Sequence, residues 1–149
     1  MASDRATGVV AAVQRDHREI EEMLNTVEEA SGAARRAAFD RLAEKMKVHE
    51  AAEEEVVHPL AMAEGNGDTV DELVDEEMTA ARALTRLEGM DFDSDEFERA
   101  FAELKHDVLA HAKQEERDEH PQLLEDTPDD ELERREEMFE RAERAAASR

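Results

Sequence analysis

The sequence contains no cysteine, tryptophan or tyrosine, and only 5 of its 149 residues are phenylalanine. The absence of cysteine excludes disulfide frameworks, thiolate metal sites and thiol catalysis. The absence of tryptophan and tyrosine excludes a conventional core of large aromatic side chains. Leucine, isoleucine, valine and phenylalanine together number only 27 residues. A strongly charged chain with so few of these residues is suspected of being disordered.

The chain also lacks long apolar runs and has few basic residues. No stretch approaches the roughly 20 apolar residues needed to span a bilayer, and the N-terminus does not resemble a signal peptide. Acidic residues number 42 against 19 basic ones, which gives a formal net charge of -23. This charge repels nucleic acid and anionic lipid and attracts cations. We therefore expect a cytoplasmic protein that binds neither nucleic acid nor membranes.

Residues that favour helices are abundant, and the segments that break helices are few and short. Stretches rich in alanine, glutamate, arginine and leucine are separated by short breaks at 31–32, 65–68, 89–94 and 126–128. These features predict an all-α fold whose short connections join antiparallel neighbours. Asp93 is expected to cap the fourth helix. The predicted helices cover residues 6–30, 33–63, 69–88, 94–124 and 128–147.

Apolar residues in the first four predicted helices recur at alternating steps of three and four, and we call each such series a core stripe. This spacing is typical of helices that face partners in a bundle. It predicts an up-down antiparallel four-helix bundle over residues 1–125. Residues 126–149 are expected to add a C-terminal helix that packs on the bundle or mediates assembly. The expected state is a monomer or a weak homodimer.

Six polar residues interrupt the core stripes well inside their helices. They are His17, His49, Glu53, Glu77, His111 and Glu115. A lone carboxylate in such an interior is costly unless it is protonated, paired or bound to metal, and no lysine or arginine occupies a stripe. Three imidazoles and three carboxylates in one bundle therefore indicate a metal site. The alternative is a metal-free acidic interaction module with hydrogen-bonded core histidines.

The spacing of these residues repeats within the chain. His49 and Glu53 lie one helical turn apart on a shared face, and the same pair recurs as His111 and Glu115, 62 residues later. Each pair can give a nitrogen to one ion while its carboxylate bridges to a second, as in two-metal bundle sites. Three further histidines lie off the stripes and are expected to be exposed or, for the first and last, to line the bundle mouth. These are His58, His106 and His120, whereas Asp118 lies near the end of the fourth stripe.

These motifs resemble those of the hemerythrin-like (HHE) cation-binding domain family. The resemblance covers about residues 8–125 and rests on Asp16-His17 and on the two His-x-x-x-Glu pairs, each followed by proline. It implies a centre of two non-heme iron ions joined by an oxo or hydroxo bridge, although manganese or zinc suits the same ligands. By the resemblance, Glu53 and Glu115 correspond to bridging carboxylates. The corresponding terminal nitrogen ligands are His17, His49 and His111.

One departure from the family concerns the third helix, where the family usually has histidine. This chain has Glu76-Glu77, and Glu77 takes the stripe position unless a rotation of the helix gives that role to Glu76. A carboxylate in place of a neutral imidazole adds negative charge, which should stabilise ferric iron and disfavour reversible oxygen carriage. With reversible oxygen carriage disfavoured, three kinds of function remain. The protein could bind or react with oxygen, peroxide or nitric oxide, it could act as a catalase- or oxidase-like enzyme, or it could sense iron.

Overall fold

The computed structural model describes residues 6–148, and every regular element among them is helical. The all-α prediction is therefore confirmed for the described part of the chain. No helix in this part has the length and apolarity needed to cross a membrane. The elements are α1 (Gly8–Glu29), α2 (Gly32–Ala52), η2 (Glu53–Val57), α3 (His58–Ala63), α4 (Gly67–Glu88), α5 (Asp95–Gln114), η3 (Glu115–Glu119), α6 (His120–Asp126) and α7 (Asp129–Ala147), where η denotes a π-helical turn.

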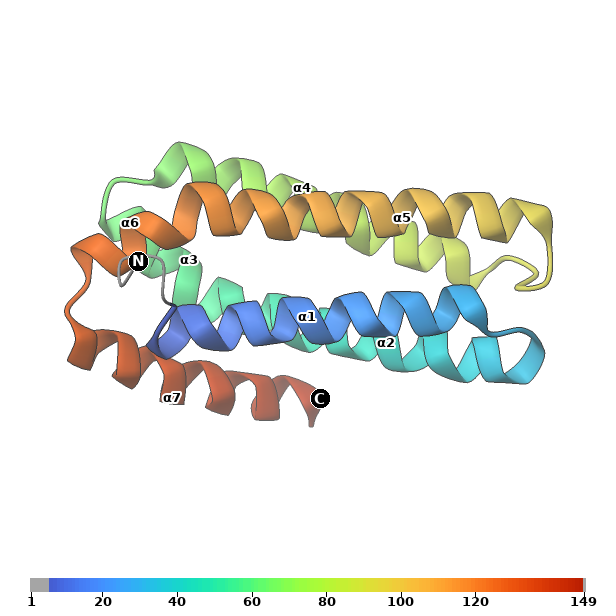
Figure 1. Ribbon diagram of the computed structural model, residues 1–149, viewed down its shortest axis with the longest axis horizontal. Helices are drawn as coiled ribbons and strands as arrows, with labels where there is room; N and C mark the ends of the chain where they lie inside the picture. Colours follow the sequence, from blue (N-terminus) through green and yellow to red (C-terminus); the bar gives the residue numbers. More distant parts are fainter. Residues whose placement is uncertain (1–5, 149) are drawn as a thin grey trace.

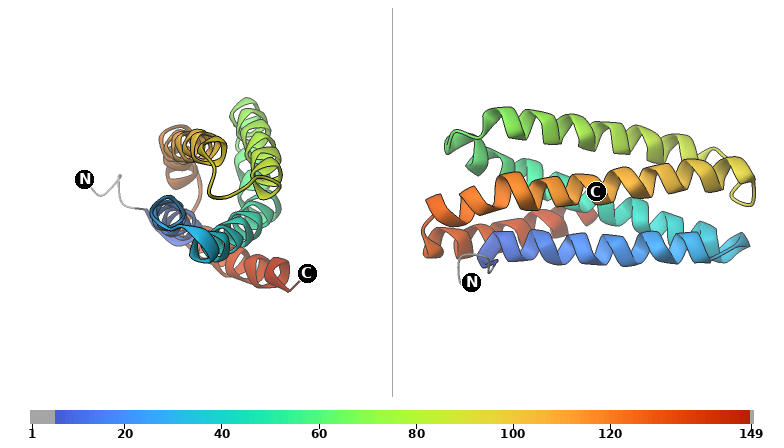
Figure 2. Two further views of the ribbon diagram at one scale, coloured as in Figure 1. Left: turned by 90° about the vertical axis from the view of Figure 1, so that its right-hand side faces the viewer. Right: turned by 45° about the horizontal axis from the view of Figure 1, so that its top comes forward.

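The helices form long rods that lie side by side (Figure 1). One rod is α1, a second runs from α2 through η2 into α3, a third is α4, and a fourth runs from α5 through η3 into α6. The α1 helix packs against α2, and α4 packs against α5, so the chain forms two helical hairpins. The α7 helix lies along the outside of the first hairpin, in contact with α1 and α2 (Figure 2).

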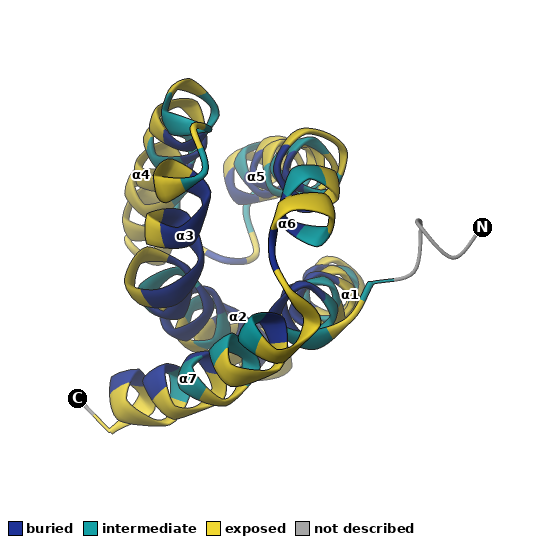
Figure 3. Cartoon of the chain, turned by 90° about the vertical axis from the view of Figure 1, so that its left-hand side faces the viewer, coloured by how far each residue is buried: buried dark blue, intermediate teal, exposed yellow. Residues whose placement is uncertain are grey.

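Buried apolar residues form two separate clusters, and the buried faces of the helices turn toward one another (Figure 3). One cluster joins α1, α3, α6 and α7 around Phe139. The other lies toward the far ends of the two hairpins, around Phe39. Along α1, His17 separates Val13 of the first cluster from Ile20 of the second. The scarce aliphatic residues are thus concentrated on both sides of a polar layer.

The π-helical turns occur where a proline follows that polar layer. Pro59 follows η2, and Pro121 follows η3. A proline cannot donate to the carbonyl four residues back, and its ring clashes with that carbonyl. A wider turn relieves the clash: the N–H of His58 donates to the carbonyl of Glu53, and the corresponding bond recurs in η3. The predicted helices over residues 33–63 and 94–124 are therefore each interrupted once by a π-helical turn.

The start of α5 differs from the predicted cap by one residue. The Ser94 hydroxyl accepts a hydrogen bond from the N–H of Phe97 at 3.1 Å, so Ser94 caps the helix. The side chain of Asp93 instead accepts a hydrogen bond from the N–H of Gly32, also at 3.1 Å. Aspartate and serine can both cap a helix. Here the side chain of Asp93 is engaged with the start of α2, and Ser94 takes the capping position.

Two glycines begin helices with left-handed backbone conformations, but only one has a close neighbour. Gly8, at the start of α1, has φ +56°, and a Cβ added there would lie 2.6 Å from the backbone carbonyl of Leu132 in α7. Gly32, at the start of α2, has φ +58°, with nothing within 4 Å of the same position. Gly8 therefore permits the close approach of α7 to α1.

We expect Gly8→Ala to reduce the free energy of unfolding more than Gly32→Ala does. Gly32→Ala adds only the strain of a left-handed backbone, about 1–2 kcal/mol. Gly8→Ala adds the same strain and also pushes the start of α7 away from α1. Urea denaturation of both variants at matched metal content measures the difference. Equal losses would show that this contact with α7 contributes nothing to stability.

Candidate metal centre

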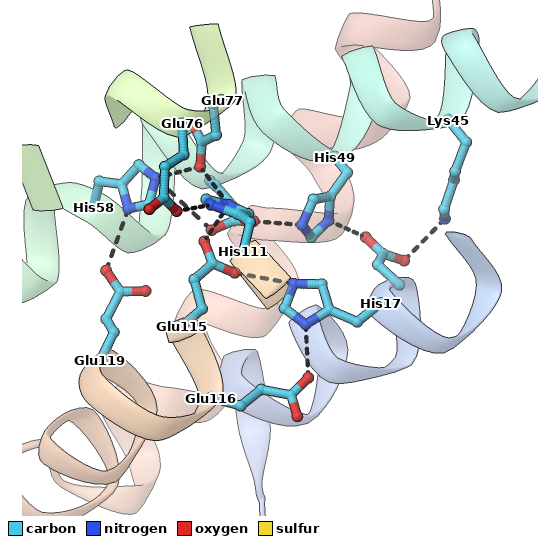
Figure 4. A network of polar contacts seen from close by, with 12 residues as sticks. His17, Lys45, His49, His58, Glu76, Glu77, His111, Glu115, Glu116 and Glu119 are labelled. Carbon is cyan, nitrogen blue, oxygen red and sulfur yellow. Dashed lines mark hydrogen bonds and ion pairs between the residues drawn. The ribbon is translucent and has the colours of Figure 1, made fainter. Parts of the chain in front are cut away.

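The structure brings all six polar stripe residues together in the layer between the apolar clusters. Figure 4 labels His17, His49, Glu77, His111 and Glu115 among them. His17 Nε2 lies 2.9 Å from Glu115 Oε1. His111 Nε2 lies 3.4 Å from Glu115 Oε2 and 3.5 Å from Glu77 Oε2. His49 Nε2 is in contact with Glu53 Oε1. All are buried except the half-buried His111, and Glu115 is fully inaccessible to solvent.

The atoms at the middle of this layer have no hydrogen-bond partners. These atoms are Nε2 of His17, Nε2 of His49 and all four carboxylate oxygens of Glu53 and Glu115. They lie close to one another, but their contacts lack the direction of hydrogen bonds. Buried polar atoms left in this state are costly, and a metal cation would satisfy them together. Nitrogen and oxygen donors of this kind suit iron, manganese or zinc.

Two overlapping groups of buried side chains have the geometry of metal ligands. Within each group, one potential ligand atom per residue lies within 4.8 Å of all the others. The first group is His17, His49, Glu53 and Glu115, and the second is Glu53, His58, Glu77 and Glu115. Glu53 and Glu115 belong to both groups, so each could supply an oxygen to either one. His111 adjoins the second group through its contacts with Glu77 and Glu115.

Each of the three predicted histidines has an acidic partner at its outer ring nitrogen. A hydrogen bond donated from Nδ1 fixes the tautomer that leaves Nε2 free to bind a metal. The partners lie on neighbouring helices, so they also fix the orientation of each ring. The three contacts are His17 Nδ1 to Glu116 Oε2 at 2.7 Å, His49 Nδ1 to Asp16 Oδ2 at 2.8 Å, and His111 Nδ1 to Glu76 Oε1 at 2.8 Å. The structure thus places Glu77 inside the layer and Glu76 outside it.

His58 is a candidate ligand that the stripe pattern missed. Its side chain is buried, so the expectation that it is exposed is wrong. Its Nε2 lies 3.0 Å from Glu77 Oε2, and its Nδ1 lies 3.3 Å from Glu119 Oε2. In an α-helix, His58 would lie about 140° around the axis from Glu53. The π-helical turn brings it back toward that face, and the proline after it is the signal in the sequence.

The matching turn in η3 overturns two further expectations. Asp118, predicted near the end of a core stripe, is instead exposed and paired with Arg117, whereas Glu119 is buried. His120 is also buried, contrary to the expected exposure, and its ring stacks on that of His17 with centroids 6.1 Å apart. His106 is exposed, as predicted.

The α7 helix covers the outer side of His49. The ring of Phe139 meets the His49 ring edge-on, with centroids 5.9 Å apart. Glu143 lies beside Asp16, the partner of His49 Nδ1. Lys45 Nζ contacts the other oxygen of Asp16 at 2.9 Å. The ammonium group of Lys45 therefore already neutralises Asp16. Because of this, Asp16 and Glu143 support the ring of His49 instead of forming another metal site.

Without a metal, protons neutralise this layer. Burial alone would lower the pKa of His17, but the carboxylates of Glu115 and Glu116 outweigh it and raise the pKa to about 9. Burial and the charge of Glu115 raise the pKa of Glu53 to about 8. Burial opposes ionisation of Glu115 too, yet the close side chains of Glu53, His111 and His17 hold its pKa well below the usual value. Glu53 therefore keeps its proton near neutral pH, whereas Glu115 is ionised.

The helical fold and the layer of histidines and glutamates define a cation-binding helical protein. Residues 8–123 match the sequence profile of the hemerythrin HHE cation binding domain, so the chain belongs to that family. The fold is similar to that of a hemerythrin HHE cation binding domain-containing protein from Mycobacterium kansasii, with a TM-score of 0.84 at 20% sequence identity. That similarity covers 96% of this chain and 89% of the other. No curated protein matches the chain.

The metal-free protein should lose stability as the pH rises. The pKa of His17 is raised from 6.5 to about 9. The contribution of His17 to the stability of the fold is therefore complete below pH 6.5 and is lost as the pH passes 9. Glu53, with its pKa raised from 4.5 to about 8, acts in the same direction. His58 and His111, whose pKa values are about 11 and 12, extend the fall to higher pH.

Urea denaturation of chelator-treated protein at a series of pH values tests this expectation. Between pH 6.5 and 9, unfolding should release at least about one proton per chain, and His17→Gln should release fewer. A stability that stays constant or rises over this interval would contradict the assignment of charges.

Proposed function

We propose that this chain is a non-heme di-iron protein that binds or reacts with oxygen, peroxide or nitric oxide. The supporting observation is that two groups of buried ligand-type residues share Glu53 and Glu115. In this proposal, residues 1–125 form the antiparallel four-helix bundle that holds the centre. Residues 126–149 form an additional helix that supports it from outside.

The geometry gives each side chain a role. His17 and His49 would hold one iron, and His58, Glu77 and His111 the other. Glu53 and Glu115 would lie between the two ions. The carboxylates at the outer nitrogens keep protons on Nδ1 and leave Nε2 to bind. The apolar clusters on either side exclude water from the layer.

Iron is the proposed metal because the family resemblance implies it, and the mixture of imidazole with several carboxylates suits it. Bound iron would supply redox chemistry and an open position for a small ligand. The alternative of a metal-free acidic module leaves the central nitrogens and oxygens without partners. A cavity that reaches His17, His49 and His111 gives a reactant access to the centre. This access favours an oxidase- or catalase-like role over iron sensing.

Metal analysis of aerobically purified protein should find about two irons per chain. Glu115→Ala should lose most of this iron, because it removes an oxygen donor from both positions. His106→Ala changes an exposed imidazole and should keep the full complement. The ultraviolet-visible spectrum should show charge-transfer bands that disappear only in Glu115→Ala. Wild-type protein without bound iron after growth in iron-rich medium would eliminate the proposal.

A second comparison tests the role of His58. His58→Ala should reduce the iron content by about one ion per chain, since it removes a nitrogen from only one of the two groups. His120→Ala alters the equivalent position of the sequence repeat and should leave the content unchanged. Circular dichroism of both variants checks that they fold. A His58→Ala variant with the wild-type iron content would remove His58 from the ligand set.

A further inference from the structure

A cavity of about 380 Å³ lies between the two helical hairpins, directly beside the metal centre. One part of its wall consists of side chains of the centre, among them His49 and His111. Most of the remaining interior is apolar and extends toward the cluster around Phe39, although the half-buried Glu50 and Gln114 also line it. Its apolar side chains are Ile20, Met46, Ala80, Ala83, Leu104 and Val108.

The volume is much larger than a diatomic molecule or peroxide requires. A water molecule takes up about 30 Å³ in the liquid, so the cavity has room for about twelve groups of that size. Pockets that bind organic molecules begin at roughly 300 Å³. Small side chains on α4 leave this space. Ala80 occupies a stripe position between Leu73 and Leu87, and the small side chain of Ala83 lies beside it.

The lining also restricts the charge of a ligand. The exposed residues at its edge include Glu72, Asp75 and Asp107, and no lysine or arginine lies among the residues that line it. The acidic edge repels anions, while the apolar interior disfavours any charged group. A cavity lined in this way is suited to an uncharged molecule with an apolar body.

We propose that this cavity binds an uncharged, apolar organic molecule, of the size of a medium-chain alcohol or a fused aromatic ring system. The bound molecule lies against His49 and His111 and is therefore next to the two metal positions. Binding itself requires only the cavity. The role of this molecule as a reactant rests on the proposed function, because it depends on iron at the adjacent centre.

The test measures binding of 1-aminoanthracene, an uncharged fluorophore whose emission rises in apolar surroundings, to the purified iron-containing protein. Calorimetry repeats the measurement independently of emission. We expect saturable binding at one site. Ala80→Leu combined with Ala83→Leu fills the cavity and should weaken binding at least tenfold. The matched control is Ala81→Leu, which makes the same change on the exposed face of α4 and should bind like wild type.

Val108→Phe fills the cavity from α5 and provides a second test if the double variant does not fold. Wild-type affinity in a folded, filled variant, or no saturable binding to wild type, would overturn the proposal. Octanol should displace the fluorophore at least ten times more effectively than octyl sulfate. Equal displacement by the two would overturn the assignment to uncharged molecules.

Iron content measured on the same samples separates the two proposals. Wild-type protein with about two irons and no fluorophore binding would refute the cavity proposal and leave the di-iron proposal intact. Specific binding to the cavity in protein that never takes up iron would refute the di-iron proposal and leave the cavity intact.

Discussion

The burial of Glu53 and Glu115 between the helical rods is the constraint on which the rest of the structure depends. Two carboxylates this close cannot both stay ionised in a dry interior without a compensating positive charge. Imidazoles from α1, α2, α3 and α5 surround them, and protons or metal ions supply that charge. The core is consequently divided into two apolar clusters, which hold the rods together on either side of the polar layer.

This division gives part of the acidic surface a structural role. Asp16, Glu76 and Glu116 lie next to core-stripe positions on their helices, where the composition alone indicates only solvated charge. In the structure each one accepts a hydrogen bond from the outer nitrogen of a buried histidine. Because the ring orientation depends on these bonds, the surplus of carboxylates contributes to the geometry of the centre as well as to the charge of the surface.

The sequence predicts those parts of the site that follow a regular α-helical period. His17, His49 and Glu77 were found because steps of three and four identify one face of a helix. His58 and Glu119 were missed because a π-helical turn precedes or includes them, and it changes which residues face inward. The His-Pro pairs mark both turns in the sequence, but a constant period cannot show how far a wider turn rotates the residues after it. The cavity beside Ala80 was not predicted either, since its size depends on how far apart the two hairpins lie.

The two halves of the internal repeat differ in the carboxylates that surround equivalent histidines. His58 and His120 hold equivalent positions, and burial lowers the pKa of both. Carboxylates of Glu119 and Glu77 reverse this effect at His58 and raise its pKa to about 11. At His120, burial together with the neighbouring His17 lowers the pKa to about 4. The carboxylates that contact each histidine therefore decide its charge. Where α4 presents the carboxylate of Glu77, the imidazole of His58 on α3 lies against it, with Nε2 3.0 Å from Glu77 Oε2.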